Sequence, residues 1–159
     1  MTSHDISIMV NGVRRTGSVP ARLTLADYLR ERLDLTATHL ACEHGVCGAC
    51  TVIVDGETAR ACLMLTVQAD GSEVTTFEGM TKNGELGPIQ EGLWTKHGMQ
   101  CGFCTPGFAM TISELLDENP EPTRDQIVEA LGGNLCRCTG YVKIIEAVEE
   151  AVAIRGGVT

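Results

Sequence analysis

Apolar and polar positions alternate at the start of the chain. The segment 4–10 carries isoleucine or valine at every second position from its third residue, which predicts a half-buried β-strand. The Asn11-Gly12 pair that follows is a strong signal for a tight hairpin turn. We therefore expect a second strand over 13–19, antiparallel to the first.

The pattern then changes to helical spacing for one short stretch before it returns to strands. Thr24 is placed to cap a helix, with Asp27 three residues later as the second half of a capping-box-like start. A β-branched run predicts a strand over 51–54, and the Asp55-Gly56 turn signal predicts that 57–62 pairs back with it. A final strand is predicted over 74–77. Together these elements predict a compact α+β unit, with a mixed sheet against one helix.

The second half of the chain keeps helical spacing throughout. A Gly-containing stretch over 79–84 is typical of a linker, and it separates a first domain over 1–78 from a second domain over 85–159. Proline at early helix positions and glycine after helix ends delimit the helices. Four helices are predicted, over 88–97, 105–118, 123–131 and 141–154. Four short helices with apolar stripes favour a four-helix bundle.

Composition and charge narrow the class of protein. The chain of 159 residues is 43% hydrophobic and 21% charged, as in globular proteins. Its net charge of −9 and its lack of a Lys/Arg cluster argue against nucleic-acid binding. No apolar run reaches the roughly 18 residues that a membrane span needs. The N-terminus lacks the pattern of a signal peptide, so we expect a cytoplasmic protein with no membrane span.

Eight cysteines in such a compartment favour metal ligation over disulfides. The first group has the spacing C-x4-C-x2-C-x11-C, and its opening is the plant-type ferredoxin spacing for a [2Fe–2S] cluster. Gly45 and Gly48 allow the sharp turns that aim backbone amides at the sulfur atoms. Zinc usually takes two close pairs of cysteines instead, so the cluster is favoured over zinc. The four candidate ligands are Cys42, Cys47, Cys50 and Cys62.

The second group combines a C-x2-C pair with a C-x-C pair, and each pair precedes a predicted helix. Helix N-termini present free amides and a positive dipole end, which favour thiolates over thiols. Taken by itself, this group suits zinc as well as an iron–sulfur cluster. Its candidate ligands are Cys101, Cys104, Cys136 and Cys138.

Three runs of residues resemble one known family. They are CEHGVCGAC at 42–50, QCGFCTPG at 100–107 and GNLCRCTGY at 133–141. In this order they resemble the separate small iron–sulfur subunit of the molybdenum hydroxylases, which include xanthine dehydrogenase and aerobic carbon monoxide dehydrogenase. The resemblance implies an N-terminal plant-ferredoxin-like β-grasp domain, a C-terminal four-helix bundle, and one [2Fe–2S] cluster in each.

The same resemblance implies partners and a role. A large subunit would hold a molybdenum-pterin cofactor, a medium subunit would hold FAD, and two such heterotrimers would associate. Electrons from the hydroxylated or oxidised small molecule would pass from molybdenum through this chain to FAD, with no substrate chemistry on the chain itself. The family's pattern places Gln100 and Cys138 against the pterin. A side-chain amide both donates and accepts hydrogen bonds, which suits a pterin edge.

One departure from the family bears on the substrate. Carbon monoxide dehydrogenases resemble one another in having Asp-Thr-Ser after the first cysteine, whereas this chain has Glu43-His44-Gly45. The difference favours N-heteroaromatic compounds, purines or aldehydes over carbon monoxide. His44 either faces the FAD partner or lies in solvent, and the roles of His97 and Arg137 are open between a cluster neighbour and a surface residue.

Two other functions stay open at this point. A free-standing two-cluster ferredoxin would shuttle electrons between partners as a monomer. A zinc-stapled interaction module would be colourless and without sulfide. The content of iron and acid-labile sulfide distinguishes the zinc-stapled module from the electron-transfer subunit and from the free-standing ferredoxin.

Overall fold

A five-stranded mixed sheet forms the first part of the chain in the computed structural model, which describes residues 2–81 and 83–157. The strand order is β2-β1-β5-β3-β4, and β1 pairs with β5 in parallel while the other pairs are antiparallel. The predicted hairpin is confirmed, with Val10 opposite Val13 across the turn. The strands are β1 (Ser3–Val10), β2 (Val13–Pro20), β3 (Thr51–Val54), β4 (Glu57–Arg60) and β5 (Glu73–Thr75).

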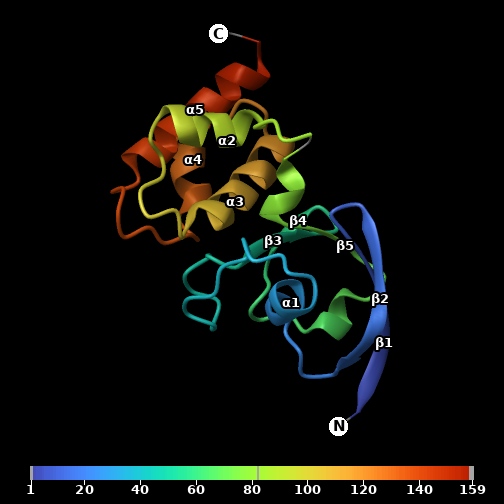
Figure 1. The fold of residues 1–159 in the computed structure, drawn as a ribbon. Helices are drawn as coiled ribbons and strands as arrows, with labels where there is room; N and C mark the ends of the chain where they lie inside the picture. Colours follow the sequence, from blue (N-terminus) through green and yellow to red (C-terminus); the bar gives the residue numbers. More distant parts are fainter. Residues whose placement is uncertain (1, 82, 158–159) are drawn as a thin grey trace.

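Beside a 3₁₀ turn (Thr66–Ala69), a longer helical segment packs on this sheet, as Figure 1 shows. It consists of the short helix α1 (Leu25–Asp27) and a continuing π-helical turn (Tyr28–Arg32). The predicted cap is confirmed, because the backbone amide of Asp27 donates to the Thr24 hydroxyl at 3.1 Å. Leu25 and Leu29 are fully buried against the sheet, where they form one core with the inward residues of β1.

Two predicted strands end earlier than expected. The strand predicted over 57–62 stops at Arg60, because the chain turns there and the amide of Leu63 donates to the Arg60 carbonyl at 2.9 Å. Cys62 therefore lies in a turn and not in a strand. The strand predicted over 74–77 ends at Thr75, and Phe77–Met80 form a 3₁₀ turn in its place.

Four helices make up the second part, which confirms the predicted bundle. They are α2 (Pro88–Thr95), α3 (Thr105–Glu118), α4 (Arg124–Leu131) and α5 (Val142–Arg155). Tyr141, predicted to be in the last helix, instead caps it in a left-handed conformation with φ of 69°. Phe108, Ile112 and Leu116 of α3 are buried at the centre of this second core, as their spacing predicts.

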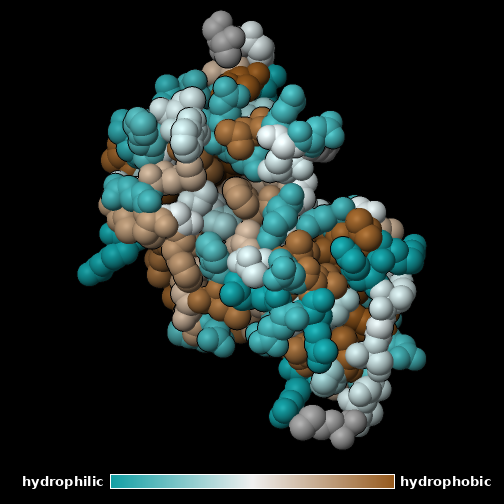
Figure 2. All heavy atoms as spheres, in the orientation of Figure 1, coloured by the Kyte–Doolittle hydropathy of each residue, from teal (hydrophilic) through white to brown (hydrophobic). Residues whose placement is uncertain are grey.

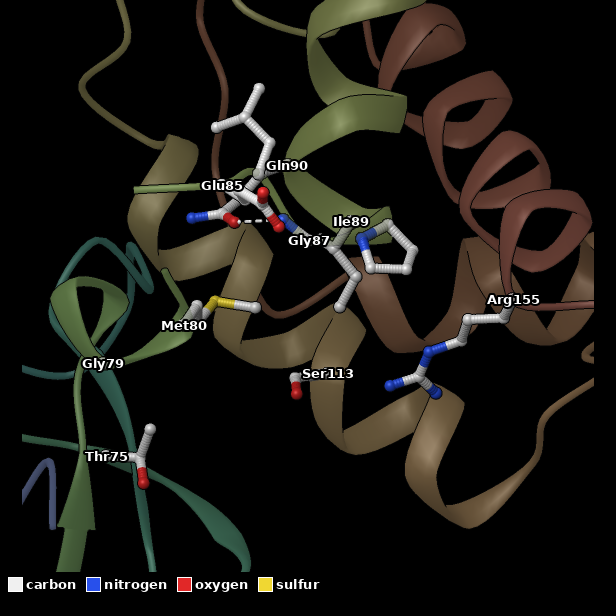
Figure 3. A pocket seen from close by; sticks show the side chains of 11 residues that line it. Thr75, Gly79, Met80, Glu85, Gly87, Ile89, Gln90, Ser113 and Arg155 are labelled. Atoms are coloured by element: carbon white, nitrogen blue, oxygen red, sulfur yellow. Dashed lines mark hydrogen bonds between the residues drawn. The ribbon is translucent and has the colours of Figure 1, made fainter. Parts of the chain in front are cut away.

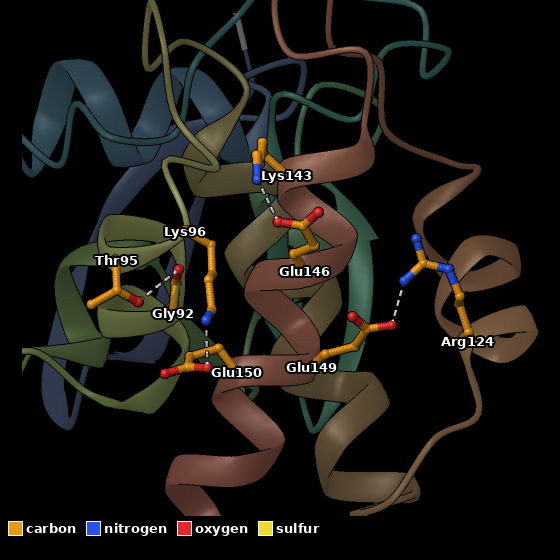
Figure 4. Close-up of polar contacts among 8 residues, drawn as sticks. All are labelled: Gly92, Thr95, Lys96, Arg124, Lys143, Glu146, Glu149 and Glu150. Carbon is orange, nitrogen blue, oxygen red and sulfur yellow. Dashed lines mark hydrogen bonds and ion pairs between the residues drawn. The ribbon is translucent and has the colours of Figure 1, made fainter. Parts of the chain in front are cut away.

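The helix α5 is held against its neighbours by close packing and by surface ion pairs. Gly92 of α2 lies so near α5 that an added Cβ would meet the Ala147 carbonyl oxygen at 2.3 Å. Figure 4 shows two ion pairs between α5 and its neighbours, Lys96–Glu150 from the end of α2 and Arg124–Glu149 from α4, and a third pair, Lys143–Glu146, within α5 itself. Because these pairs are partly exposed and screened by solvent, they contribute little beside the apolar core.

Hydrophobic residues are interspersed with hydrophilic ones over both parts of the molecule on the face drawn in Figure 2. Trp94, Leu86 and Phe103 are among the large apolar side chains that the structure leaves exposed. Within residues 2–81 and 83–157, no helix has the length and apolar character needed to cross a membrane.

Candidate metal centres

The first cysteine group lies in the loop 42–50, which precedes β3, and in the turn after β4. Gly45 and Gly48 have φ of +84° and +74°, so the loop makes the sharp turns for which glycine is suited. The Cys47 amide points at the Cys42 sulfur, with a nitrogen–sulfur distance of 3.4 Å. The predicted role of this loop, to present backbone amides to sulfur, is therefore visible in its geometry.

The four thiols of the first group lie in two different environments, one half-buried and one buried. Backbone amides, first that of His44 and then that of Cys47, lower the pKa of Cys42 to about 6. Burial raises the pKa of Cys50 to about 11, and the Cys62 thiol lies within hydrogen-bonding reach of Cys50. The group thus divides into a half-buried pair, Cys42 with Cys47, and a buried pair, Cys50 with Cys62.

The second group joins the segment before α3 to the segment before α5. The Cys101 and Cys138 sulfur atoms lie 3.5 Å apart, and both residues are exposed. Cys104 is the N-terminal cap residue of α3, so the predicted placement at a helix N-terminus is confirmed there. Its thiol lies within hydrogen-bonding reach of Cys136, so this group also divides into two pairs.

The pKa values of Cys104 and Cys136, the two less exposed thiols of this group, shift in opposite directions. Burial raises the pKa of Cys104 to about 12. Burial, the largest single influence, acts in the same direction on Cys136, but hydrogen bonds from Thr139, the Cys138 amide and the Cys104 thiol together lower the pKa of Cys136. The Thr139 hydroxyl lies 3.1 Å from the Cys136 sulfur and its amide lies 3.4 Å away. This residue therefore supplies two donors to a sulfur atom, a role that the sequence alone did not assign to it.

The pairwise arrangement suits a two-iron centre. Two thiolates on one tetrahedral metal ion with bonds of about 2.3 Å lie roughly 3.7 Å apart, close to the 3.5 Å between Cys101 and Cys138. A [2Fe–2S] centre binds two such pairs, one on each iron. Within the described part of the chain, no three His, Cys, Asp or Glu side chains lie close enough together to hold one metal ion.

The two cysteine loops are in direct contact. The Leu135 amide donates to the Cys47 carbonyl at 2.9 Å, and the Asn134 side-chain amide donates to the Gly48 carbonyl at 3.1 Å. Arg60 adds a third link, because its guanidinium donates to the Gly133 carbonyl at 2.7 Å. Sequence reasoning missed Asn134 and Arg60, although Asn134 lies in one of the three family-like runs.

Other residues singled out in the sequence lie at the surface. Gln100 is exposed beside the exposed Cys101, on the outer side of the second group. The His44 ring nitrogen Nδ1 pairs with the Cys42 carbonyl. His97 follows the end of α2 with φ of 56°, and both it and Arg137 are exposed.

A cavity lies away from the cysteines, between the end of β5 and the helices α2 and α3 (Figure 3). Its volume is about 430 Å³, and its lining includes Met80, Gln90, Ser113 and Arg155. The Arg155 guanidinium is bonded to the Leu116 carbonyl at 2.9 Å and to Asp117 at 2.9 Å. No cysteine lines this cavity, so it adds no ligand to either group.

Two family models match the chain. The 2Fe-2S iron-sulfur cluster binding domain matches residues 8–76, and the [2Fe-2S] binding domain matches residues 76–149. Each match contains one of the two cysteine groups. The chain therefore has two domains of [2Fe–2S]-binding families, with the α+β arrangement that the sequence predicts.

Relatives match over almost the full length. The nicotine 6-hydroxylase small subunit of Paenarthrobacter nicotinovorans is 54% identical over 147 residues, which are 92% of this chain and 88% of that protein. The caffeine dehydrogenase subunit gamma of Pseudomonas sp. (strain CBB1) is 52% identical over 152 residues, 94% of this chain and 91% of that protein. A chain of quinoline 2-oxidoreductase from Pseudomonas putida 86 superposes with a TM-score of 0.93 at 46% identity, with 99% of both chains covered. This chain therefore belongs to the molybdenum hydroxylase family, as a small [2Fe–2S] electron-transfer subunit of its multi-subunit complexes.

Proposed function

We propose that the chain carries electrons from a molybdenum-pterin site on a large subunit to FAD on a medium subunit. The resident groups, two [2Fe–2S] clusters, supply one-electron transfer. The eight cysteines ligate them in the pairs that lie together in the structure. These pairs are Cys42 with Cys47, Cys50 with Cys62, Cys101 with Cys138, and Cys104 with Cys136.

The observation that carries this proposal is the direct contact between the two loops. The carbonyl of Cys47 accepts from the amide of Leu135 at 2.9 Å, and Leu135 is the residue before Cys136. One hydrogen bond therefore links the backbone at a ligand of the first group to the backbone beside a ligand of the second. Such a short connection supports electron transfer from one cluster to the other within the chain.

The exposed residues beside each cysteine group favour one partner subunit for each group. Cys101 and Cys138 are exposed and Gln100 stands beside them, which suits contact with the pterin-bearing large subunit. The first loop exposes Glu43 and His44 on the other group, which suits contact with the FAD-bearing subunit. The path then runs from the second group to the first.

The names of the relatives support an N-heteroaromatic substrate for the whole complex. Nicotine, caffeine and quinoline, which appear in those names, all contain nitrogen heterocycles. We propose this class of substrate over aldehydes on the basis of those names, and over carbon monoxide in line with the Glu43-His44-Gly45 sequence of the first loop. We also propose a dimer of heterotrimers as the assembly, with the small subunit divided at a linker over 79–84.

The test is to purify the native complex and add nicotine, caffeine or quinoline without oxygen. We expect three different chains with molybdenum-pterin and FAD, and reduction of the iron–sulfur signals followed by reduction of FAD. A complex with Cys136→Ser should still bind molybdenum-pterin but should not pass electrons to FAD. A chain that elutes alone, without molybdenum-pterin and FAD subunits, would overturn the proposal and favour a free-standing ferredoxin.

A further inference from the structure

The side chain of Asn134 connects the two cysteine loops from a buried position, since only 1% of its surface is exposed. Its Nδ2 donates to the Gly48 carbonyl at 3.1 Å, across 86 positions of sequence. Its Oδ1 accepts from the Thr111 hydroxyl of α3 at 2.9 Å. Both ends of the amide are therefore used, and the direction of the side chain is fixed.

The segments around Asn134 approach so closely that only glycine fits at two positions. A Cβ added to Gly48 would meet the Asn134 Nδ2 at 2.6 Å and the Gly133 carbonyl oxygen at 2.7 Å. A Cβ added to Gly107 of α3 would meet the Gly48 carbonyl oxygen at 2.2 Å. The first loop, the second loop and the start of α3 thus meet at Asn134 without an intervening side chain.

The backbone of Asn134 is tied to the second group as well. The Tyr141 hydroxyl donates to the Asn134 carbonyl at 3.1 Å and accepts from the Cys136 amide at 3.0 Å. The next residue, Leu135, donates its amide to the Cys47 carbonyl. A displacement of Asn134 would therefore move Cys136 relative to Cys47.

We propose that Asn134 is a positioning residue, which fixes the contact between the two cysteine loops and so sets the electronic coupling between the two iron–sulfur centres. This inference rests on the proposed relay. Asn134 touches no reacting atom itself, and it acts through the Cys47–Leu135 hydrogen bond. Loss of the Asn134 amide would leave the Gly48 carbonyl and the Thr111 hydroxyl without this partner, which disfavours the present arrangement of the two loops.

A second contact between the same two parts of the chain provides a matched control. Glu114 of α3 accepts from the amide and the hydroxyl of Thr58 on β4, the latter at 2.8 Å. Glu114→Ala removes side-chain contacts between the two parts but leaves both cysteine loops untouched. The test compares it with Asn134→Ala and with Thr111→Val, which removes the hydroxyl that holds the Asn134 Oδ1.

Each variant is studied in the intact complex, reduced with dithionite, so that substrate and FAD play no part in the first measurement. We expect the magnetic splitting between the two reduced centres to weaken in Asn134→Ala and to weaken less in Thr111→Val. Intramolecular transfer between the centres should fall by about tenfold in Asn134→Ala, since small displacements of reacting groups reduce rates steeply. Hydrogen exchange at the Leu135 amide should become faster in both variants, and Glu114→Ala should change none of the three.

Unchanged splitting in Asn134→Ala, with iron and sulfide at full content, would overturn the inference. An equal loss in Glu114→Ala would also overturn it, because the effect would then belong to general contact between the domains. If Asn134→Ala loses a centre, the splitting in Thr111→Val is the deciding measurement, because Thr111 lies outside both loops. Unchanged splitting in Thr111→Val would then overturn the inference. A complex that shows the expected splitting but passes no electrons to FAD would overturn the proposed relay and not the role of Asn134.

Discussion

The ring of His39 stacks on the ring of Phe103, with centroids 4.7 Å apart and an angle of 18° between the planes. The Nδ1 of His39 also pairs with the Phe103 carbonyl oxygen at 2.7 Å. Phe103 lies between Cys101 and Cys104, so a residue of the first part of the chain holds the loop that carries half of the second group. The second group is thereby fixed from the ferredoxin-like side as well as from its own bundle.

Replacing this histidine should loosen that loop. In His39→Ala the stacked pair and its hydrogen bond are lost, which together are worth about 1–2 kcal/mol. We expect Tm to fall by roughly 2–6 °C and hydrogen exchange over 101–104 to become faster. His4→Ala, at an exposed position of β1, is the control and should change neither quantity. Exchange over 101–104 equal to that of the unchanged chain would show that the contact does not hold the loop.

Single cysteine variants should separate the two centres. Cys62→Ser removes a buried proposed ligand of the first group, and Cys136→Ser removes a proposed ligand of the second. Each variant should retain about two iron and two acid-labile sulfide per chain instead of about four, and one magnetic resonance signal instead of two. The two variants serve as controls for each other, because each should lose the signal that the other keeps. Zinc without sulfide in the unchanged protein would contradict the premise that the chain binds two [2Fe–2S] centres.

The features that could be predicted from the sequence are those with local causes. Asn11-Gly12 specifies its hairpin within a few residues, and Thr24 caps its helix within three positions. The cysteine spacing predicts two metal centres because ligands of one centre cluster along the chain. For the same reason the helix bounds, such as those of α3, agree with the apolar spacing and with the residues that start and stop helices.

The features that were missed depend on contacts between distant residues. Asn134 bonds to Gly48 across 86 positions, and no periodicity in the sequence marks such a pair. His39 carried no signal because its partner, Phe103, lies 64 positions away. The turn at Cys62 is predicted as strand because the Asp55-Gly56 turn indicates a returning strand but no local signal marks its end, and the paired register ends at Arg60. Tertiary contacts decide these features, and local patterns do not report them.

A methyl group at the junction of the loops should be poorly tolerated. In Gly107→Ala the added Cβ would lie 2.2 Å from the Gly48 carbonyl oxygen, which is backbone and cannot move aside cheaply. We expect a loss of about 1–3 kcal/mol in the free energy of unfolding, measured by denaturant titration of the loaded chain. Gly17→Ala on β2 is the matched control, because nothing lies within 4 Å of its added Cβ. Equal stability of the two variants would contradict the close approach of α3 to the first loop.

Removal of iron should affect the loops far more than the cores. The two apolar cores, around Leu29 in the first part and Phe108 in the second, are fully buried and are built mainly from non-cysteine side chains. The loops 42–50 and 133–141, by contrast, carry proposed cluster ligands, and metal binding energy adds to the folding energy of such segments. After chelation we expect a lower Tm, fast hydrogen exchange in both loops, and slow exchange retained in β1 and α3. Iron and sulfide added back should restore protection in the loops. Loss of protection throughout the chain on chelation would show instead that the clusters, and not the apolar cores, hold the fold together.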